Sequence, residues 1–255
     1  MQDRATMSLK LGKTPARPGA MQFKLSNYIN KAVLPKPPAH FGHEQLIGSH
    51  AWQLLGNDQY GDCVWAGAAH ETMMWNMEAG HAVTFSEQSV LGDYSKVTGF
   101  KPTDPSTDQG TDMQVAASYR RKTGIEDANG HRHKVAAYLA ITPGDLEEHY
   151  QAMYLFGAVG IGINVPTTAM DQFRQNKPWD VVPGASIEGG HYIPLVAKRT
   201  NLECVTWGQI QPMTVRFFEK YNDESVAYVS LEMLAHNKSP EGFNAAQLQK
   251  DLAAL

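Results

Sequence analysis

The order of helix-like and strand-like segments constrains the fold of this chain most strongly. Four segments with helical periodicity or helix-capping signals come first, at residues 64–79, 86–99, 110–125 and 143–157. Short β-branched segments bounded by Gly, Pro or Asn follow, at residues 158–166, 191–199, 202–207 and 225–232, together with a helix-like stretch at 213–221. Because the two kinds of segment do not alternate in βαβ order, the pattern predicts an α+β fold.

The composition places the chain among ordinary globular proteins. Its 255 residues are enough to bury a sizeable core, and 42% of them are hydrophobic. Two cysteines cannot form a disulfide framework, which favours a reducing compartment. The N-terminal residues lack the apolar stretch of a secretory signal, and the longest apolar run, residues 152–165, is too short to span a bilayer. We therefore expect a cytoplasmic or virion-associated location, with no signal peptide and no membrane segment.

The first 40 residues differ in charge from the rest. They contain seven basic residues and one acid, a net charge of +6, so the remainder carries −10. Three prolines between residues 34 and 43 favour extended backbone. We therefore divide the chain into a basic arm, residues 1–48, and a folded domain, residues 49–255. The arm is either a solvated tail or a docking segment, and we expect its partner to be a protein or a neighbouring subunit rather than nucleic acid or a membrane.

One of the two cysteines stands where a polar turn becomes a helix. In "LLGNDQYGDCVWAGAAHETMMW", a loop rich in Asn, Asp and Gly leads into Cys63, and the helical pattern begins at once. A helix N-terminus stabilises a thiolate through its dipole and free amides, and a nearby imidazolium lowers the thiol pKa further. Cys63 is therefore a candidate nucleophile, with a small buried residue as the alternative. Cys204, inside an apolar strand, is interpreted as a core residue.

A nucleophilic cysteine needs a base, and His191 in "SIEGGHYIPLVA" is the candidate. It begins a strand, and Gly189 and Gly190 leave room for the backbone of a substrate. A satisfied core histidine is the alternative. Asn57 and Gln59 precede Cys63 by six and four residues, and either side chain can donate a hydrogen bond to an oxyanion.

The order of these motifs resembles that of the papain-like cysteine peptidases over residues 54–230. The Cys63 loop with Trp65, "FSEQSVLGDY", "GTDMQVAASYRRKTGI", "PGDLEEHYQAMYLFGAVGIGINV", "GGHYIPLVA" and "CVTWG" follow one another in the family's order. The 128 residues between Cys63 and His191 are close to the family spacing of about 130. The resemblance implies a helical part around the Cys63 helix, a C-terminal antiparallel part, and hydrolysis of a peptide or amide bond without a cofactor.

The departures from the family pattern concern the groups around His191. When Trp207 is aligned with the family tryptophan, Val205 stands where the catalytic Asn belongs, and valine cannot hydrogen-bond an imidazole. Thr206 is then the candidate orienter from a shifted position, and Trp207 a shield over the histidine. Trp65 follows Cys63 by two residues rather than one, and we count it with Gly189 and Gly190 among the substrate-cleft candidates.

Two functions from different classes remain open. One is a weakened or specialised thiol hydrolase that acts on a peptide or protein substrate. The other is an inactive papain-like module used in a phage particle or another assembly, which the missing Asn and the absence of a recognisable pro-segment favour. A hydrogen-bonded Cys63–His191 pair beside an open cleft would favour the enzyme, and a filled cleft the module. The pair His131 and His133 lacks further ligands at metal-site spacing, so we expect no metal.

Overall fold

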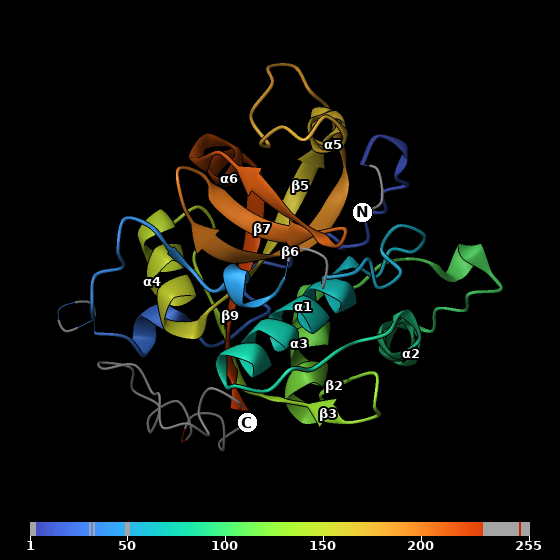
Figure 1. Ribbon diagram of the computed structural model, residues 1–255, viewed down its shortest axis with the longest axis horizontal. Coiled ribbons are helices and arrows are strands. Elements are labelled where there is room, and N and C mark those ends of the chain that lie inside the picture. The colour runs from blue at the N-terminus through green and yellow to red at the C-terminus, as the bar shows by residue number, and fades with distance from the viewer. Residues whose placement is uncertain (1–3, 31, 33, 49–51, 232–249, 251–255) are drawn as a thin grey trace.

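The computed structural model describes residues 4–30, 32, 34–48, 52–231 and 250 (Figure 1). Within this part of the chain, seven strands form one antiparallel sheet in the order β4-β9-β5-β6-β7-β8, with β1 beside β6. Their bounds are β1 Phe41–Gly42, β4 Val135–Ala140, β5 Val159–Pro166, β6 Ile187–Lys198, β7 Leu202–Thr206, β8 Gln209–Met213 and β9 Asn222–Ser230. A separate two-stranded sheet joins β2 Ile125–Glu126 to β3 Arg132–His133.

The α-helices are α1 Cys63–Glu78, α2 Glu87–Thr98, α3 Met113–Lys122, α4 Leu146–Phe156, α5 Thr167–Arg174 and α6 Val215–Tyr221. Short 3-10 turns lie at Arg4–Thr6, Leu25–Asn27, Glu44–Leu46 and Pro105–Thr107. Helices α1, α2 and α3 group together at one side of the sheet (Figure 1). The expected α+β architecture is confirmed, with a helical part around the cysteine helix and a C-terminal antiparallel part.

Helix boundaries follow the capping residues. The Ser86 side chain accepts a hydrogen bond from the Ser89 amide at the start of α2, and the Asp112 side chain accepts one from the Val115 amide at the start of α3. Gly99 ends α2 in the left-handed conformation, with φ of 77°. These polar caps explain why the sequence located both helices to within three residues at each end.

Strand β6 divides two hydrophobic cores, because its side chains alternate between the two faces of the sheet. Ile193 and Leu195 pack into the core beneath α4, α5 and α6, whereas Tyr192 and Val196 pack into the core with α1, α2 and α3. His191 shares the face of Ile193. Helix α1 is central to the second core, since every residue from Cys63 to Asn76 is buried.

The sequence pattern missed several elements. Strands β4 and β8 and helix α5 were not predicted, and β6 begins at Ile187 rather than at His191. Strand β9 runs over Asn222–Ser230, three residues ahead of the expected start. Among the described residues, none of the helices is both long and apolar enough to cross a membrane.

Residues of the predicted arm lie along the folded body. Phe41 and Gly42 pair with β6, Lys24 forms a bridge with Ala140 of β4, and Arg4 hydrogen-bonds Gln209 and the Ile210 carbonyl of β8. The described part of the arm is thus bound within its own chain. The division between residues 48 and 49 stays a prediction.

Candidate active site

Cys63 is the first residue of α1 and is buried. Its Sγ accepts a hydrogen bond from the Tyr192 amide of β6 at 3.4 Å. Burial raises the pKa of the Cys63 thiol to about 12, and the amides of Tyr192 and Gly12 oppose this shift. The preceding Asp62 is also buried, and burial raises the pKa of its carboxyl well above the ordinary value. In the structure as it stands, Cys63 is therefore a neutral thiol.

His191 occupies the position next to Tyr192 on β6 and is held on two sides. Its Nε2 atom lies 2.8 Å from Thr206 Oγ1, and its ring stacks on Trp207 with centroids 4.6 Å apart and an interplanar angle of 17°. Nδ1 is buried and has no hydrogen-bond partner among the described residues. The Cys63–His191 hydrogen bond that would favour an enzyme is therefore not formed in this structure. Burial lowers the pKa of the imidazole to about 3. The ring is fixed, neutral and left with one unused nitrogen.

Thr206 and Trp207 reach His191 because β7 ends beside it. Trp207 follows β7 with φ of 44°, a left-handed conformation that costs a tryptophan on the order of 1–2 kcal/mol. Edge contacts with Phe173 and Trp179 hold its indole in place. The sequence-predicted candidates Thr206 and Trp207 are thus brought together with His191.

Residues 9–14, here called the cleft segment, cross the site between Gly190 of β6 on one side and Thr111 on the other. The amides of Gly12 and Lys13 donate to the Gly190 carbonyl at 3.1 and 3.0 Å. On the other side, the Thr111 amide donates to the Gly12 carbonyl at 2.7 Å, and the Thr14 amide donates to the Thr111 carbonyl at 3.1 Å. Lys13 thereby pairs antiparallel with Gly190 and parallel with Thr111. The N-terminal segment fills the cleft beside Cys63 and His191.

Two glycines make this close approach sterically feasible. A Cβ atom on Gly12 would lie 1.9 Å from the Gly61 carbonyl oxygen, and one on Gly190 would lie 2.3 Å from the Lys13 carbonyl oxygen. Any side chain at either position would displace the cleft segment. Gly190 thus accommodates the backbone of the cleft segment, and a Cβ atom on Gly189 would lie 3.0 Å from Leu11 of the same segment. The expectation that these glycines leave room for a substrate stays a prediction.

The two candidate oxyanion donors, Asn57 and Gln59, differ in burial. Asn57 is buried, and its Nδ2 donates to the Lys10 carbonyl at 3.4 Å and to the Tyr60 carbonyl at 3.2 Å. Trp207 Nε1 donates to the same Lys10 carbonyl at 3.2 Å. Gln59 is exposed. Asn57 and Trp207 therefore converge on one peptide oxygen of the cleft segment.

The remaining substrate-cleft candidate, Trp65, is buried behind Thr111. Its Nε1 donates to Thr111 Oγ1 at 2.9 Å, and its ring packs edge-on against Tyr119. Trp65 thus supports the residue that binds the cleft segment. The sequence analysis did not foresee that segment, although Gly12 within a basic stretch was a signal for close backbone contact.

A buried ion pair supports the strand that carries His191. Arg120 of α3 lies 2.6 Å from Glu71 of α1, and the Tyr192 hydroxyl donates to the same carboxylate at 2.7 Å. Both charged side chains are almost fully buried. This network ties the two helices to β6 one residue away from His191.

His131 and His133 both face Asp127, at 3.5 and 3.2 Å from its Oδ2. Within the described part of the chain, no group of three or more His, Cys, Asp and Glu side chains is arranged to hold a metal ion. The two histidines thus belong to a small ion-pair cluster beside β3.

No protein-family model and no curated protein sequence matches this chain. Several solved structures do match in three dimensions. Xylellain, a cysteine protease from Xylella fastidiosa, superposes with a TM-score of 0.65 at 12% identity, covering 91% of this chain and 99% of the other. The fold is papain-like. Procathepsin B S9 from Trypanosoma congolense gives a TM-score of 0.61 at 10% identity over 87% of this chain and 86% of its own.

The Carica candamarcensis cysteine protease CMS1MS2 is similar at a TM-score of 0.54 and 15% identity, over 75% of this chain and 98% of that one. Identities in this range establish a shared architecture alone. The chemistry of this site therefore depends on the residues of this chain.

Proposed function

We propose that this chain is a thiol hydrolase of the peptidase or amidase type, held in a covered state by its cleft segment. The observation that carries the proposal is the setting of His191. One ring nitrogen is bound to Thr206, the other is buried without a partner, and the next backbone amide contacts the Cys63 sulfur. A buried histidine with a purely structural role would be expected to form hydrogen bonds through both ring nitrogens.

In the proposed reaction, His191 takes the proton of the Cys63 thiol and the thiolate attacks the carbonyl carbon of a peptide or amide. Asn57 and the Cys63 backbone amide stabilise the oxyanion, an effect of roughly 3 kcal/mol. His191 then protonates the leaving amine, and water releases the acyl group from sulfur. Thr206 positions the imidazole, and Trp207 shields it from water.

In the proposed covered state, the cleft segment keeps both reacting groups out of water. The Gly12 amide donates to the Gly190 carbonyl, and the Gly12 carbonyl accepts from the Thr111 amide. With the segment in place, burial raises the thiol pKa and lowers the imidazole pKa, which keeps both groups neutral. Release of the segment admits water and removes the cause of both shifts.

The second candidate function is the interaction module, and the filled cleft favours it. In that case the cleft segment is a permanent part of the fold, and a protein partner or neighbouring subunit binds elsewhere. A cytoplasmic or virion-associated location stays a prediction under both functions.

One labelling experiment on the full-length chain distinguishes the two functions. Gly12→Val should expel the cleft segment, because its side chain overlaps the Gly61 backbone. We expect iodoacetamide to alkylate Cys63 of this variant rapidly near pH 5, and His191→Ala in the same background to abolish that reactivity. Gly48→Val is the matched control, since a Cβ atom there meets nothing within 4 Å. Labelling that starts only above about pH 8 and ignores His191 would favour the module.

A further inference from the structure

Lys13 carries a fully buried ammonium group inside the site. Its side chain is 0% exposed, and its Nζ lies 3.0 Å from Asp223 Oδ2 and 3.0 Å from the Thr14 carbonyl oxygen. Lysine is almost never buried to this extent unless it is paired. The backbone of the same residue is bound by Gly190 and Thr111. The Lys13 side chain therefore enters the protein interior at the point where Gly190 and Thr111 hold the backbone of the cleft segment.

A glycine of the sheet creates the space that this side chain occupies. A Cβ atom on Gly162 of β5 would lie 2.0 Å from Lys13 Cε and 2.8 Å from Asp223 Oδ1. We call this space the Lys13 channel, with Gly162 and Gly190 as its walls and Asp223 as its floor. Any larger residue at position 162 would close it.

The floor of the Lys13 channel is acidic. Asp223 begins a run of two carboxylates at the start of β9, and the second, Glu224, is partly buried. Burial raises the pKa of Glu224 to about 7, its acidic neighbours Asp112 and Asp223 add to the shift, and the Lys13 ammonium opposes it. Oδ1 of Asp223 is buried and has no hydrogen-bond partner among the described residues, and Oδ2 contacts the Lys13 ammonium, so removal of that cation would be unfavourable.

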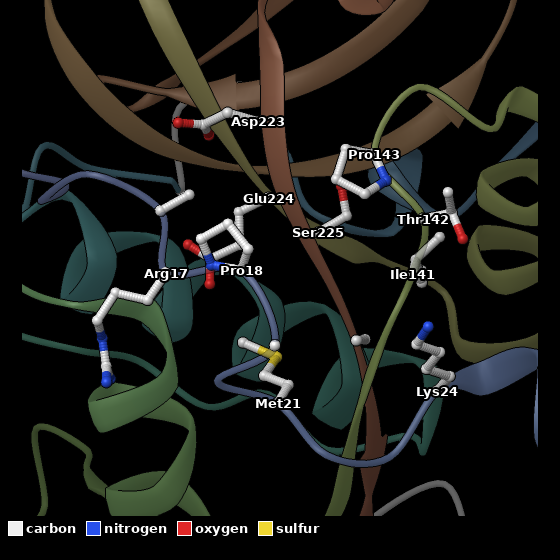
Figure 2. A pocket seen from close by; sticks show the side chains of 13 residues that line it. Arg17, Pro18, Met21, Lys24, Ile141, Thr142, Pro143, Asp223, Glu224 and Ser225 are labelled. Carbon is white, nitrogen blue, oxygen red and sulfur yellow. The ribbon is translucent and has the colours of Figure 1, made fainter.

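The floor is also next to an open space. A cavity of about 340 Å³ is lined by Asp223, Glu224, residues 16–19 and residues 140–143. Figure 2 shows Arg17, Pro18 and Met21 on one side of β9 and Ile141, Thr142 and Pro143 on the other. One wall of this cavity, residues 16–19, follows the cleft segment directly in the chain, and release of the cleft segment would open this wall. The floor can then accommodate a guanidinium, which is larger than the ammonium of lysine.

We propose that the Lys13 channel is the specificity pocket of this site and selects a lysine or arginine side chain of a peptide substrate. Lys13 of the cleft segment occupies the position of that side chain in the covered state. The inference rests on the proposed hydrolase function for its catalytic part. The binding of a cation by the channel does not depend on it.

A binding experiment on the full-length Lys13→Ala variant tests the channel itself. The substitution empties the channel and leaves Asp223 without its cation, so n-butylammonium should bind and raise the melting temperature by about 3–6 °C at about ten times its Kd. The neutral 1-pentanol should have no such effect, and Lys13→Ala/Asp223→Asn should not respond to butylammonium. Equal responses to the two probes, or none to either, would overturn the proposal.

A kinetic experiment on full-length Gly12→Val tests the choice of substrate. Fluorogenic peptides that differ only in carrying Lys, Arg, Leu or Glu at either of the two residues before the scissile bond are compared. We expect Lys and Arg to exceed Leu and Glu in kcat/KM by about tenfold or more at one of the two positions. Asp223→Asn should remove that preference.

The outcomes distinguish the two proposals. Hydrolysis with a preference for Leu that Asp223→Asn does not change contradicts the specificity pocket and leaves the hydrolase intact. Slow, His191-independent labelling with no hydrolysis contradicts the hydrolase, and the butylammonium measurement then decides whether the channel binds a cation. A channel that binds butylammonium only when Asp223 is present supports the inference in either case.

Discussion

The Nε2 atom of His191 lies 2.8 Å from the hydroxyl of Thr206, fifteen residues further along the chain. The bond joins β6 to the last residue of β7 and leaves Nδ1 free for a proton. A hydroxyl both donates and accepts hydrogen bonds, so this contact is compatible with either tautomer of the imidazole. Thr206 therefore fixes the orientation of the proposed base.

Thr206→Val removes this hydroxyl with little change in volume. In the Gly12→Val background, we expect the rate of Cys63 alkylation at pH 5–6 to fall about tenfold, the equivalent of a hydrogen bond of about 1.4 kcal/mol. Thr206→Ser keeps the hydroxyl and should restore most of the rate. The role of Thr206 is contradicted when valine and serine react at the same rate.

Displacement of the cleft segment should be visible to a protease. In the wild-type protein, Lys13 is buried and its amide is bonded to Gly190, so trypsin should cut after Lys13 only slowly. In Gly12→Val, we expect rapid cleavage there while the sites between residues 52 and 231 stay uncut. Mass spectrometry of a digestion time course measures both. Equal protection in Gly12→Val and in the control Gly48→Val would show that the segment does not depend on its close approach to Gly61.

The buried pair of Glu71 and Arg120 should be important for stability. Arg120→Ala leaves the Glu71 carboxylate buried without its cation, and we expect the free energy of unfolding to fall by about 3–5 kcal/mol. Lys122→Ala, at an exposed position of the same helix, is the control and should change it by less than about 0.5 kcal/mol. Urea denaturation at neutral pH compares the two variants, and similar midpoints would argue against a structural role for the pair.

Three buried histidines predict a loss of stability in mild acid. Burial lowers the pKa of His70 and of His149 to about 4 and that of His191 to about 3. The unfolded chain binds protons at these residues below about pH 6.5, whereas the folded chain does not, so stability decreases as the pH falls from 6.5 towards 4. At pH 5, each histidine accounts for roughly 2 kcal/mol.

His70→Gln tests one of these contributions. His70 Nε2 lies 2.7 Å from the Trp52 carbonyl, and a glutamine keeps a donor there without a titrating proton. The difference in unfolding free energy between pH 7 and pH 5 should shrink by roughly 2 kcal/mol in the variant. An unchanged difference would mean that His70 titrates normally in the folded protein.

The sequence predicted the elements whose ends are set by local chemistry. Ser86 and Asp112 cap their helices through side-chain hydrogen bonds, so each leaves a local signal. Gly189 and Gly190 lie inside β6, and for this reason the expected start of that strand at His191 was four residues late. Strand β8 contains Gln, Gln and Pro in five residues, and α5 begins after Pro166 without a side-chain cap. Tertiary packing determines these elements, and a short sequence pattern does not reveal it.

The covered site could not be predicted for a related reason. The cleft segment is bound mainly through its backbone, and the counter-ion of Lys13 is Asp223, 210 residues away. From the sequence alone, a basic stretch with two prolines nearby is typical of a solvated arm. By contrast, Cys63 stands at a helix start and His191 in a strand, and their spacing resembles that of the papain-like peptidases, so the sequence predicted that they share one site.

The central claim is that Cys63 and His191 form an ion pair once the cleft segment is released. The most direct test is a titration of thiolate absorbance in the ultraviolet, between about pH 3 and pH 9, for full-length Gly12→Val with and without His191→Ala. We predict a thiolate already present at pH 5 that disappears in the histidine variant. A thiolate that forms only above about pH 8 in both proteins would contradict the account.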